Sequence, residues 1–471
     1  MKTVSIYQQV KAVAVFMAIF FSETFSQAQD ITGQWNSVLS VQGMSLRIVF
    51  HINKTGEGYT STMDSPDQGA TGIPVATTTF NGSKLSLAIP NIGLSYEGEF
   101  KNDSVVGTFK QGGMSFPMTL KRTKAEVKPP VRPQEPKPPY PYRSEDVTFE
   151  NKTAGNTLAG TLTMPSTGKN FTAVILITGS GPQDRNEEIM GHKPFLVIAD
   201  YLTRCGIAVL RYDDRGTAQS TGNFATATTA DFATDAESAI AYLKTRKEIN
   251  PKKIGLMGHS EGGVIAPMVA ARSKDVGFIV MLAGTGLRGD ALLLLQTKLI
   301  AGASGMPTDK IERTAKLNSV IYEKILNSQG PVSQQEMIEL MTGMKDELAE
   351  LVPKGIIVDD FIKMNATQIS STWMQYFLRY DPAPALEKVK CPVLAVNGSL
   401  DLQVPAKENL AAISAALKKG GNTKVTVKEY PNLNHLFQEC TTGSPAEYAT
   451  IEQTFSPEVL KDLADWILKI Q

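Results

Sequence analysis

The stretch GLMGHSEGGV, from Gly255 to Val264, places a serine between two glycines that lie two residues before and after it. The apolar run before the serine predicts a buried strand, and the segment EGGVIAPMVAA predicts a helix. A sharp strand-to-helix turn strains the backbone of its serine, and a Cβ two residues away would collide with neighbouring backbone. Gly258 and Gly262 meet that requirement. The pattern therefore predicts that Ser260 is a nucleophile rather than a polar residue of an ordinary tight turn.

Apolar runs that end in glycine-rich or acidic loops recur along the second half of the chain. The runs are AVILITGSG from Ala173, IAVLRYDDRG from Ile207, KIGLMGHSEGG from Lys253, GFIVMLAG from Gly277 and PVLAVNGSLD from Pro392. Continuous Val, Ile and Leu runs are typical of strands covered on both faces by helices. We therefore predict an α/β fold over residues 144–471, with a doubly wound, mostly parallel sheet that binds ligands at the carboxyl ends of its strands.

A helical insertion is predicted between the last two runs, at about residues 287–380, where no strong strand pattern occurs. Ser333 and Glu336 form a capping box at the start of one of its helices. One face of that helix carries Met337, Met341, Met344 and Leu348. This stripe fits packing inside the insertion better than a substrate groove, although both interpretations stay open. We expect the insertion to cover the active edge of the sheet as a lid.

Residues 29–122 alternate apolar and polar residues, as in LRIVFHI and KLSLAI. Apolar residues that share one face are Leu46, Ile48, Phe50 and Ile52 in the first run, and Leu85, Leu87 and Ile89 in the second. This alternation, broken by Gly, Asn and Asp, predicts about eight antiparallel strands in a small all-β barrel or sandwich. The seven prolines between Pro129 and Pro141 then predict an extended, semi-rigid linker over residues 123–143.

Residues 1–28 have the order of a secretory signal peptide. Lys2 and Lys11 precede the ten apolar residues of AVAVFMAIFF, and the small residues of SQA end at Ala28. Ten apolar residues are too few to span a bilayer, so we expect an exported protein, periplasmic or secreted, with no integral membrane association. The 47 basic and 47 acidic residues cancel, and this balance argues against a nucleic-acid partner.

A serine needs a base that takes its proton, and the chain has only four histidines. His435 stands in YPNLNHLF, in a loop after the predicted last strand, whereas His259 adjoins the serine and is expected to point elsewhere. Asp401 ends PVLAVNGSLD at the same edge of the sheet, where a carboxylate would orient the histidine. The order Ser260, Asp401, His435 is that of an α/β-hydrolase triad, so we predict these three as catalytic residues.

Two backbone N–H groups are needed to stabilise the oxyanion of a tetrahedral intermediate. One is expected from Glu261, which follows the nucleophile at the start of its helix. The other is expected from the loop TGSGPQDR, at Ser180 or its neighbour Gly181.

Charged residues in two neighbouring loops leave alternatives open. Asp213, Asp214 and Arg215 in YDDRG either orient substrate or pin their own loop by ion pairs, and we favour the second. Asp184 and Arg185 are candidates for recognising a polar end of a substrate. No Cys/His cluster has the spacing of metal ligands, and no glycine-rich loop has the Lys-Ser/Thr of a phosphate cradle, so no metal or cofactor is expected.

The motifs GSGPQDRNE, YDDRGTAQSTG, GHSEGG, NGSLDLQVP and LNHLFQ together resemble α/β-hydrolases of the bacterial serine esterase branch. This branch lies near the serine aminopeptidase and dienelactone hydrolase groups and includes the EstD-like carboxylesterases. The leading β segment is similar to N-terminal domains fused to such hydrolases in Bacteroidetes. The resemblance implies Ser260, Asp401 and His435 as the triad and acyl transfer to water as the reaction. Many of these relatives have His at the position of Thr178.

We expect an exported serine carboxylesterase that acts on small or medium acyl esters. A serine peptidase of the same fold, releasing N-terminal residues or dipeptides, is the alternative, and it predicts an acidic cluster for the substrate amine. The segments KDELAE and VDDF are weak candidates for that cluster. A non-catalytic protein that binds a glycan or lipid through its β domain is the third hypothesis, and a homo-oligomer formed through that domain is a further expectation.

Overall fold

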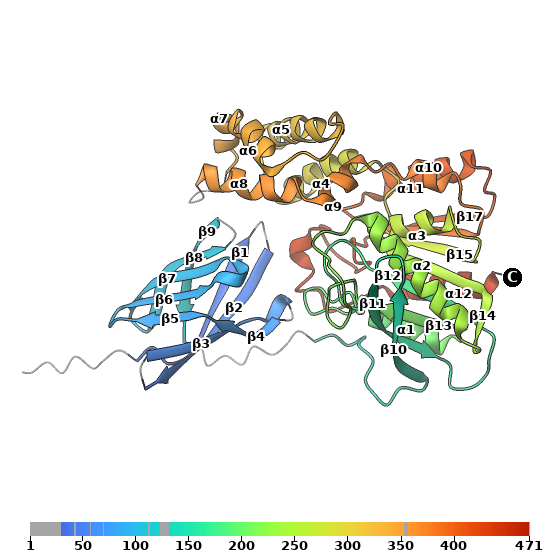
Figure 1. Cartoon of the computed structure of the whole chain (residues 1–471), viewed down its shortest axis with the longest axis horizontal. Coiled ribbons are helices and arrows are strands. Elements are labelled where there is room, and N and C mark those ends of the chain that lie inside the picture. Colours follow the sequence, from blue (N-terminus) through green and yellow to red (C-terminus); the bar gives the residue numbers. More distant parts are fainter. Residues whose placement is uncertain are drawn as a thin grey trace, which may run out of the picture.

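The computed structural model describes residues 30–41, 44–56, 58–68, 70–111, 114–122, 131–352 and 357–470. The predicted signal peptide and the predicted start of the mature chain at Gln29 lie outside these residues. Figure 1 shows a β domain, an α/β domain and a group of helices that projects from the α/β domain. Within the described residues, no helix combines the length and the apolar character needed to cross a membrane.

The β domain is one antiparallel sheet in the order β4-β3-β2-β1-β9-β8-β7-β6-β5. Its strands are β1 (Gly33–Val41), β2 (Met44–Thr55), β3 (Gly58–Ser65), β4 (Ala70–Val75), β5 (Thr77–Phe80), β6 (Lys84–Ile89), β7 (Leu94–Lys101), β8 (Ser104–Gln111) and β9 (Met114–Lys121). The two ends of the sheet approach each other, since the hydroxyls of Ser61 in β3 and Thr78 in β5 lie 2.6 Å apart. The sheet is therefore a nearly closed barrel.

The alternation of apolar residues correctly predicted which side chains face the interior of this barrel. Phe50, Ile52, Leu85 and Leu87 are all buried in one core with Trp35. About eight strands were expected, and the described residues contain nine. The short strand β5, TTTF, carries no apolar alternation that could mark it as a strand in the sequence.

The described end of the proline-rich linker, predicted to be extended and semi-rigid, lies against the α/β domain. Arg132 donates to the carbonyl oxygens of Met190 at 2.9 Å and Ala449 at 3.0 Å. Gln134 donates to the carbonyl oxygen of Phe455 at 2.7 Å. A turn closes between Arg132 and Glu135, whose N–H donates to the Arg132 carbonyl. Side chains between the prolines therefore fix residues 131–135 to the domain, which the proline content alone did not predict.

The α/β domain is built on an eight-stranded sheet in the order β10-β11-β13-β12-β14-β15-β16-β17. Its strands are β10 (Arg143–Asn151), β11 (Asn156–Met164), β12 (Phe171–Ile177), β13 (Ala208–Tyr212), β14 (Ile249–His259), β15 (Phe278–Leu282), β16 (Val393–Gly398) and β17 (Val425–Tyr430). The pairs β10–β11 and β11–β13 are antiparallel, and the other neighbours are parallel. All five apolar runs predicted as strands form strands of this sheet.

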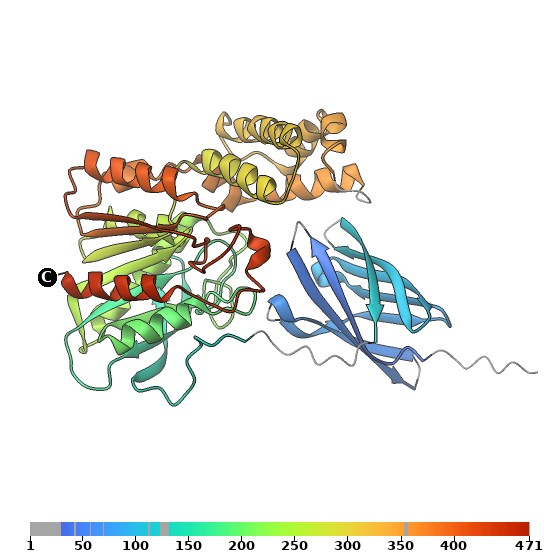
Figure 2. The same cartoon turned by 180° about the vertical axis from the view of Figure 1, so that it is seen from behind.

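Helices cover both faces of the sheet, which explains why its strands are continuously apolar. The helices α1 (Pro194–Arg204) and α12 (Pro457–Lys469) pack on one face, in the core that holds Phe195 and Leu463. The other face carries α2 (Thr229–Thr245), α3 (Gly262–Ala270), α10 (Ala383–Leu386) and α11 (Ala406–Lys419). Figure 2, the view from behind, shows that α12 lies along the sheet. This architecture confirms the predicted α/β-hydrolase fold.

Between β15 and β16 the chain forms a helical insertion, residues 289–379, which Figure 1 shows above the sheet and the β domain. Its helices are α4 (Gly289–Ala303), α5 (Thr308–Leu326), α6 (Gln334–Thr342), α7 (Lys345–Ala349), α8 (Val358–Ile369) and α9 (Thr372–Arg379). The capping box forms as predicted, because Ser333 N donates to Glu336 at 2.9 Å and Glu336 N donates to Ser333 Oγ at 3.2 Å.

The methionine stripe belongs to the core of the insertion. Met337, Met341 and Leu348 are buried together with Ile325 and Ile362. The single helix expected here is divided into α6 and α7. Gly343 and Met344 lie between them, and glycine weakens a helix interior.

Candidate active site

Ser260 stands at the turn between β14, which ends at His259, and α3, which begins at Gly262. Its φ of 51° lies in the left-handed region that non-glycine residues rarely adopt. A Cβ on Gly258 would collide with the Gly262 carbonyl, and a Cβ on Gly262 would collide with the carbonyl oxygen of Ile177. The backbone therefore needs glycine at both positions, as predicted.

His435 and Asp401 lie together at the same edge of the sheet. His435 Nδ1 is 2.7 Å from Asp401 Oδ2, and both side chains are buried. The other oxygen of Asp401 accepts the N–H groups of Gln403 and Val404, each at 2.8 Å. These bonds fix the carboxylate, and its contact with Nδ1 leaves Nε2 of His435 as the nitrogen that could accept a proton.

The loop that carries His435 is braced by the amides beside it. Asn434 Oδ1 accepts the N–H groups of Leu436 and Gln438, each at 3.0 Å. Gln438 Nε2 lies 3.0 Å from Nε2 of His192, which is fully buried. His192 therefore supports this loop from the protein interior and does not face a substrate.

Ser260 and His435 line one cavity of about 540 Å³, and Asp401 lies behind His435. Among the described residues, the Ser260 hydroxyl has no hydrogen-bond partner, which leaves it free toward the cavity. The structure thus brings two of the three predicted catalytic side chains to one cavity wall and pairs the third with the histidine. A cavity of this size fits a small-molecule ligand.

Two loops present backbone N–H groups to this cavity. The Gly179 N–H is already engaged, because it donates to Glu187 Oε1 at 2.7 Å. The N–H groups of Ser180, Gly181 and Glu261 donate to no acceptor within the described parts of the chain. These are the donors expected from the sequence, and Gly179 is excluded from that role.

Buried acids hold the loop that follows β12 in place. Asp214 accepts the Thr178 hydroxyl at 2.6 Å and the Gln183 N–H at 2.9 Å. Burial raises the pKa of the Asp214 carboxyl well above its ordinary value. Thr178 therefore ties the oxyanion loop to Asp214.

The charged residues of the two loops are bonded within the protein. Arg185 donates to both oxygens of Asp213, at 3.0 and 2.7 Å, and Arg215 Nε donates to Asp235 at 2.7 Å. Asp184 accepts the N–H groups that follow it, and neither Asp184 nor Arg185 lines the cavity. The structure agrees with the loop-pinning interpretation of YDDRG and does not place Asp184 or Arg185 against a substrate.

The sequence did not identify Glu187, which joins three parts of the site. Its Oε1 lies 2.9 Å from Nδ1 of His259 and also accepts the Gly179 N–H. Nε2 of His259 lies 3.0 Å from the carbonyl oxygen of His435. A carboxylate and a carbonyl oxygen both accept, so His259 must donate from both nitrogens and is an imidazolium. No spacing rule distinguishes Glu187 from Glu188 beside it.

Burial and charge act in opposite directions on His259. Burial lowers the pKa of its imidazole, but the charge of Glu187 and the hydrogen bonds to Glu187 and His435 outweigh it. The net result is a pKa above the ordinary value of 6.5. His192 differs, since burial lowers its pKa to about 4 and keeps it neutral.

Glu261 links the nucleophile turn to the helical insertion. Its Oε1 accepts the Thr229 hydroxyl at 2.6 Å and the Trp373 indole N–H at 2.8 Å. Burial raises the pKa of this carboxyl, and the hydrogen bonds oppose that change. Trp373 belongs to α9, so this bond holds the insertion against the residue that follows Ser260.

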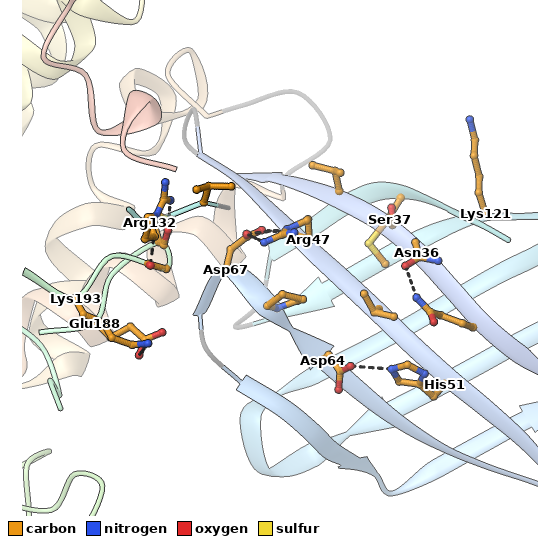
Figure 3. A pocket seen from close by; sticks show the side chains of 18 of the residues that line it. Asn36, Ser37, Arg47, His51, Asp64, Asp67, Lys121, Arg132, Glu188 and Lys193 are labelled. Carbon is orange, nitrogen blue, oxygen red and sulfur yellow. Dashed lines mark hydrogen bonds and ion pairs between the residues drawn. The ribbon is translucent and has the colours of Figure 1, made fainter. Parts of the chain in front are cut away.

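A larger cavity of about 1420 Å³ lies between the β domain and the α/β domain (Figure 3). Two side-chain pairs in its lining are Arg47 with Asp67 and His51 with Asp64. None of the three predicted catalytic residues lines it. In the part of the chain that the structure describes, no group of three or more His, Cys, Asp or Glu side chains could hold a metal ion.

A family model described as "Serine aminopeptidase, S33" matches residues 193–439 of this chain. The match includes Ser260, Asp401 and His435 and begins after the oxyanion loop. Esterase EstD of Thermotoga maritima is 27% identical over 332 residues, which cover 70% of this chain and 69% of that protein. An uncharacterized 31.7 kDa protein of Escherichia coli is 26% identical over 222 residues, 46% of this chain and 70% of its own length.

Solved structures similar to this chain include an esterase and a dienelactone hydrolase. The esterase Pf2001 of Pyrococcus furiosus is 15% identical with a TM-score of 0.42, covering 70% of this chain and 93% of its own. The dienelactone hydrolase of Anabaena variabilis is 17% identical with a TM-score of 0.38, covering 70% and 98%.

Two glycine-to-alanine substitutions should have opposite effects. Gly262→Ala forces a Cβ against the Ile177 carbonyl, so we expect a loss of about 2 kcal/mol or more in unfolding free energy. Gly302→Ala in α4 meets only Ile311 Cδ1 at 3.9 Å, and we expect a gain of about 0.5–1 kcal/mol. Urea unfolding followed at 222 nm measures both, and a loss no larger for Gly262→Ala than for Gly302→Ala would contradict the steric account.

The two buried histidines should contribute stability in opposite pH ranges. The raised pKa of His259 means that its contribution is full below pH 6.5 and is lost as the pH rises through its folded-state pKa. The lowered pKa of His192 means that its contribution is full above pH 6.5 and is lost as the pH falls toward 4.

Urea unfolding of wild type, His259→Gln and His192→Gln over a pH series tests this. The difference between wild type and His259→Gln should shrink as the pH rises, and that between wild type and His192→Gln should shrink as the pH falls. If both differences changed in the same direction, the imidazolium assignment of His259 would be wrong.

Proposed function

Since the chain belongs to the serine aminopeptidase family, S33, and is therefore a hydrolase, we propose that it is a serine carboxylesterase acting on small or medium acyl esters. The observation that carries this proposal is the placement of Ser260, at a strained turn, in one cavity with the His435–Asp401 pair. The similarity to an esterase over 70% of the chain supports ester substrates.

In the proposed reaction, Ser260 Oγ attacks the carbonyl carbon of the ester while its proton moves to Nε2 of His435. The negative charge on the carbonyl oxygen is stabilised by the N–H groups of Glu261 and of Ser180 or Gly181. The C–O bond to the alcohol then breaks, and the leaving oxygen takes the proton from His435. Water attacks the acyl-serine, gives a proton to His435, and the acid leaves as Ser260 regains its proton.

Asp401 accepts a hydrogen bond from the Nδ1–H of His435 and stabilises the imidazolium that forms in each step. Hydrogen bonds from the Glu187–His259 pair fix the backbone of the oxyanion loop and of His435 in position relative to Ser260. The insertion contributes apolar side chains above the serine, which suits an acyl chain. Leu292, Leu293, Met374 and Phe377 line the cavity there.

A peptidase is the second candidate, because the matching family is described as one of aminopeptidases. An aminopeptidase needs an acidic group for the substrate amine. The acidic segments KDELAE and VDDF do not line the cavity, and Lys345 in the first pairs with Asp359 in the second at 2.6 Å. The two carboxyl groups that do line the cavity, Glu187 and Glu261, are already hydrogen-bonded within the protein, and this favours the esterase proposal.

Hydrolysis of p-nitrophenyl acetate by the full chain tests the esterase proposal. We expect a burst followed by steady turnover, and a fall of about 10⁶-fold in kcat for Ser260→Ala, because the nucleophile is removed. Ser304→Ala, at an exposed position after α4, is the matched control and should retain the wild-type rate. Alanine p-nitroanilide tests the peptidase in parallel. Equal rates for wild type and Ser260→Ala on both substrates would overturn the serine mechanism.

We also propose export to the periplasm or the medium, supported by the order of charged, apolar and small residues in residues 1–28. N-terminal sequencing of the protein from fractionated cells should give a chain that begins near Gln29. A full-length chain that begins at Met1 and stays in the cytosol would contradict export. Self-association through the β domain stays a prediction, which sedimentation of the mature protein would test.

A further inference from the structure

Few charged side chains line the cavity above Ser260. Its lining contains no Lys and no Arg. The two carboxyl groups in it, Glu187 and Glu261, each already accept two hydrogen bonds from the protein. The one cation in the lining, the His259 imidazolium, is already paired with Glu187, so an anionic substrate would find no free cation. Glu261 accepts both of its bonds on Oε1, and burial raises its pKa, which favours the uncharged form of this carboxyl. The charge balance of the lining therefore favours an uncharged ligand, since burying an unpaired charge is costly.

Uncommitted neutral hydrogen-bonding groups face the same cavity. Tyr322 of α5 is buried apart from 8% of its surface, and its hydroxyl bonds to no group in the described residues. The side-chain amides of Gln183 and Gln368 and the hydroxyl of Thr297 also have no partner within those residues. These groups come from the oxyanion loop and from α4, α5 and α8, so they surround the space in front of Ser260. Amides and hydroxyls both donate and accept, as do the hydroxyls of a polyol.

An aromatic surface in the cavity is held in a fixed orientation. The Trp373 ring stacks on Phe377, with centroids 5.2 Å apart and planes at 16°. The bond from the Trp373 indole N–H to Glu261 prevents this ring from turning. Rigid apolar surface combined with a few polar groups that fix orientation is typical of a specific small-molecule site.

We propose that the preferred substrate is an acyl ester of an uncharged alcohol that bears several hydroxyl groups, such as an acylated monosaccharide. The neutral amides and the Tyr322 hydroxyl bind the free hydroxyls, and the Trp373–Phe377 surface packs against the carbon skeleton. This inference rests on the proposed ester hydrolysis at Ser260 and assigns its leaving group.

The test compares kcat/KM of the full chain for three acetyl esters on six-membered rings. Methyl 4-O-acetyl-glucoside is uncharged and hydroxylated, methyl 4-O-acetyl-glucuronoside adds a carboxylate, and cyclohexyl acetate has no hydroxyl. We expect kcat/KM for the glucoside to be about tenfold higher than that for cyclohexyl acetate, which corresponds to one or two hydrogen bonds. It should be about 100-fold higher than that for the glucuronoside, because the carboxylate of the glucuronoside would be buried without a partner.

Tyr322→Phe should lower the ratio of kcat/KM for the glucoside to that for cyclohexyl acetate by about fivefold, since a single neutral hydrogen bond is lost. Tyr376→Phe is the matched control, because Tyr376 lies on α9 and does not line this cavity, and it should leave the ratio unchanged.

The outcomes separate this inference from the proposed function. If p-nitrophenyl acetate is hydrolysed in a Ser260-dependent way but the glucoside is not preferred, or Tyr322→Phe leaves the ratio unchanged, the substrate assignment is wrong and the esterase stands. A glucuronoside hydrolysed as fast as the glucoside would also overturn the assignment. If no ester is hydrolysed, the proposed function itself fails.

Discussion

The buried pair of Glu187 and His259 is the contact on which the geometry of the site depends. One oxygen of Glu187 accepts the Gly179 N–H of the oxyanion loop and also bonds to the imidazole of His259, the residue before the nucleophile. The other nitrogen of that imidazole holds the backbone of His435. Glu187 lies 72 residues before His259 in the sequence, and His435 lies 176 residues after it. Hydrogen bonds to one charge pair therefore join three distant segments. Since His259 must donate twice, the pair is strongest when it is ionised, and its burial strengthens each bond.

The sheet explains why these segments meet. The parallel strands β12, β14, β16 and β17 all end at the same edge, and the loops that follow them carry the oxyanion loop, Ser260, Asp401 and His435. The turn at Ser260 is possible only because Gly258 and Gly262 let three backbone segments approach closely. The helical insertion then closes the space above this edge, and Trp373 connects it to Glu261.

The sequence predicted the features that follow from periodicity and from backbone constraint. Continuous apolar runs predicted the parallel strands, and the glycines around Ser260 predicted the strained turn. Side-chain partners between distant segments had no such signal. Glu187 is one of two adjacent glutamates, and its φ of 52°, in the left-handed region, is not encoded by any pattern in the sequence. The docking of Arg132 depends on backbone carbonyls of distant segments, which a proline-rich pattern does not encode. The break between α6 and α7 coincides with Gly343, which the amphipathic pattern alone did not single out.

Covalent trapping of the nucleophile tests whether Ser260 is activated. The full chain is treated with diisopropyl fluorophosphate, which phosphorylates an activated serine, and its intact mass and peptides are measured. The account predicts a single diisopropylphosphoryl group on the peptide that contains Ser260, formed by wild type and absent from Ser260→Ala. Labelling of another serine, or equal labelling of both proteins, would contradict the assignment of Ser260 as the activated nucleophile.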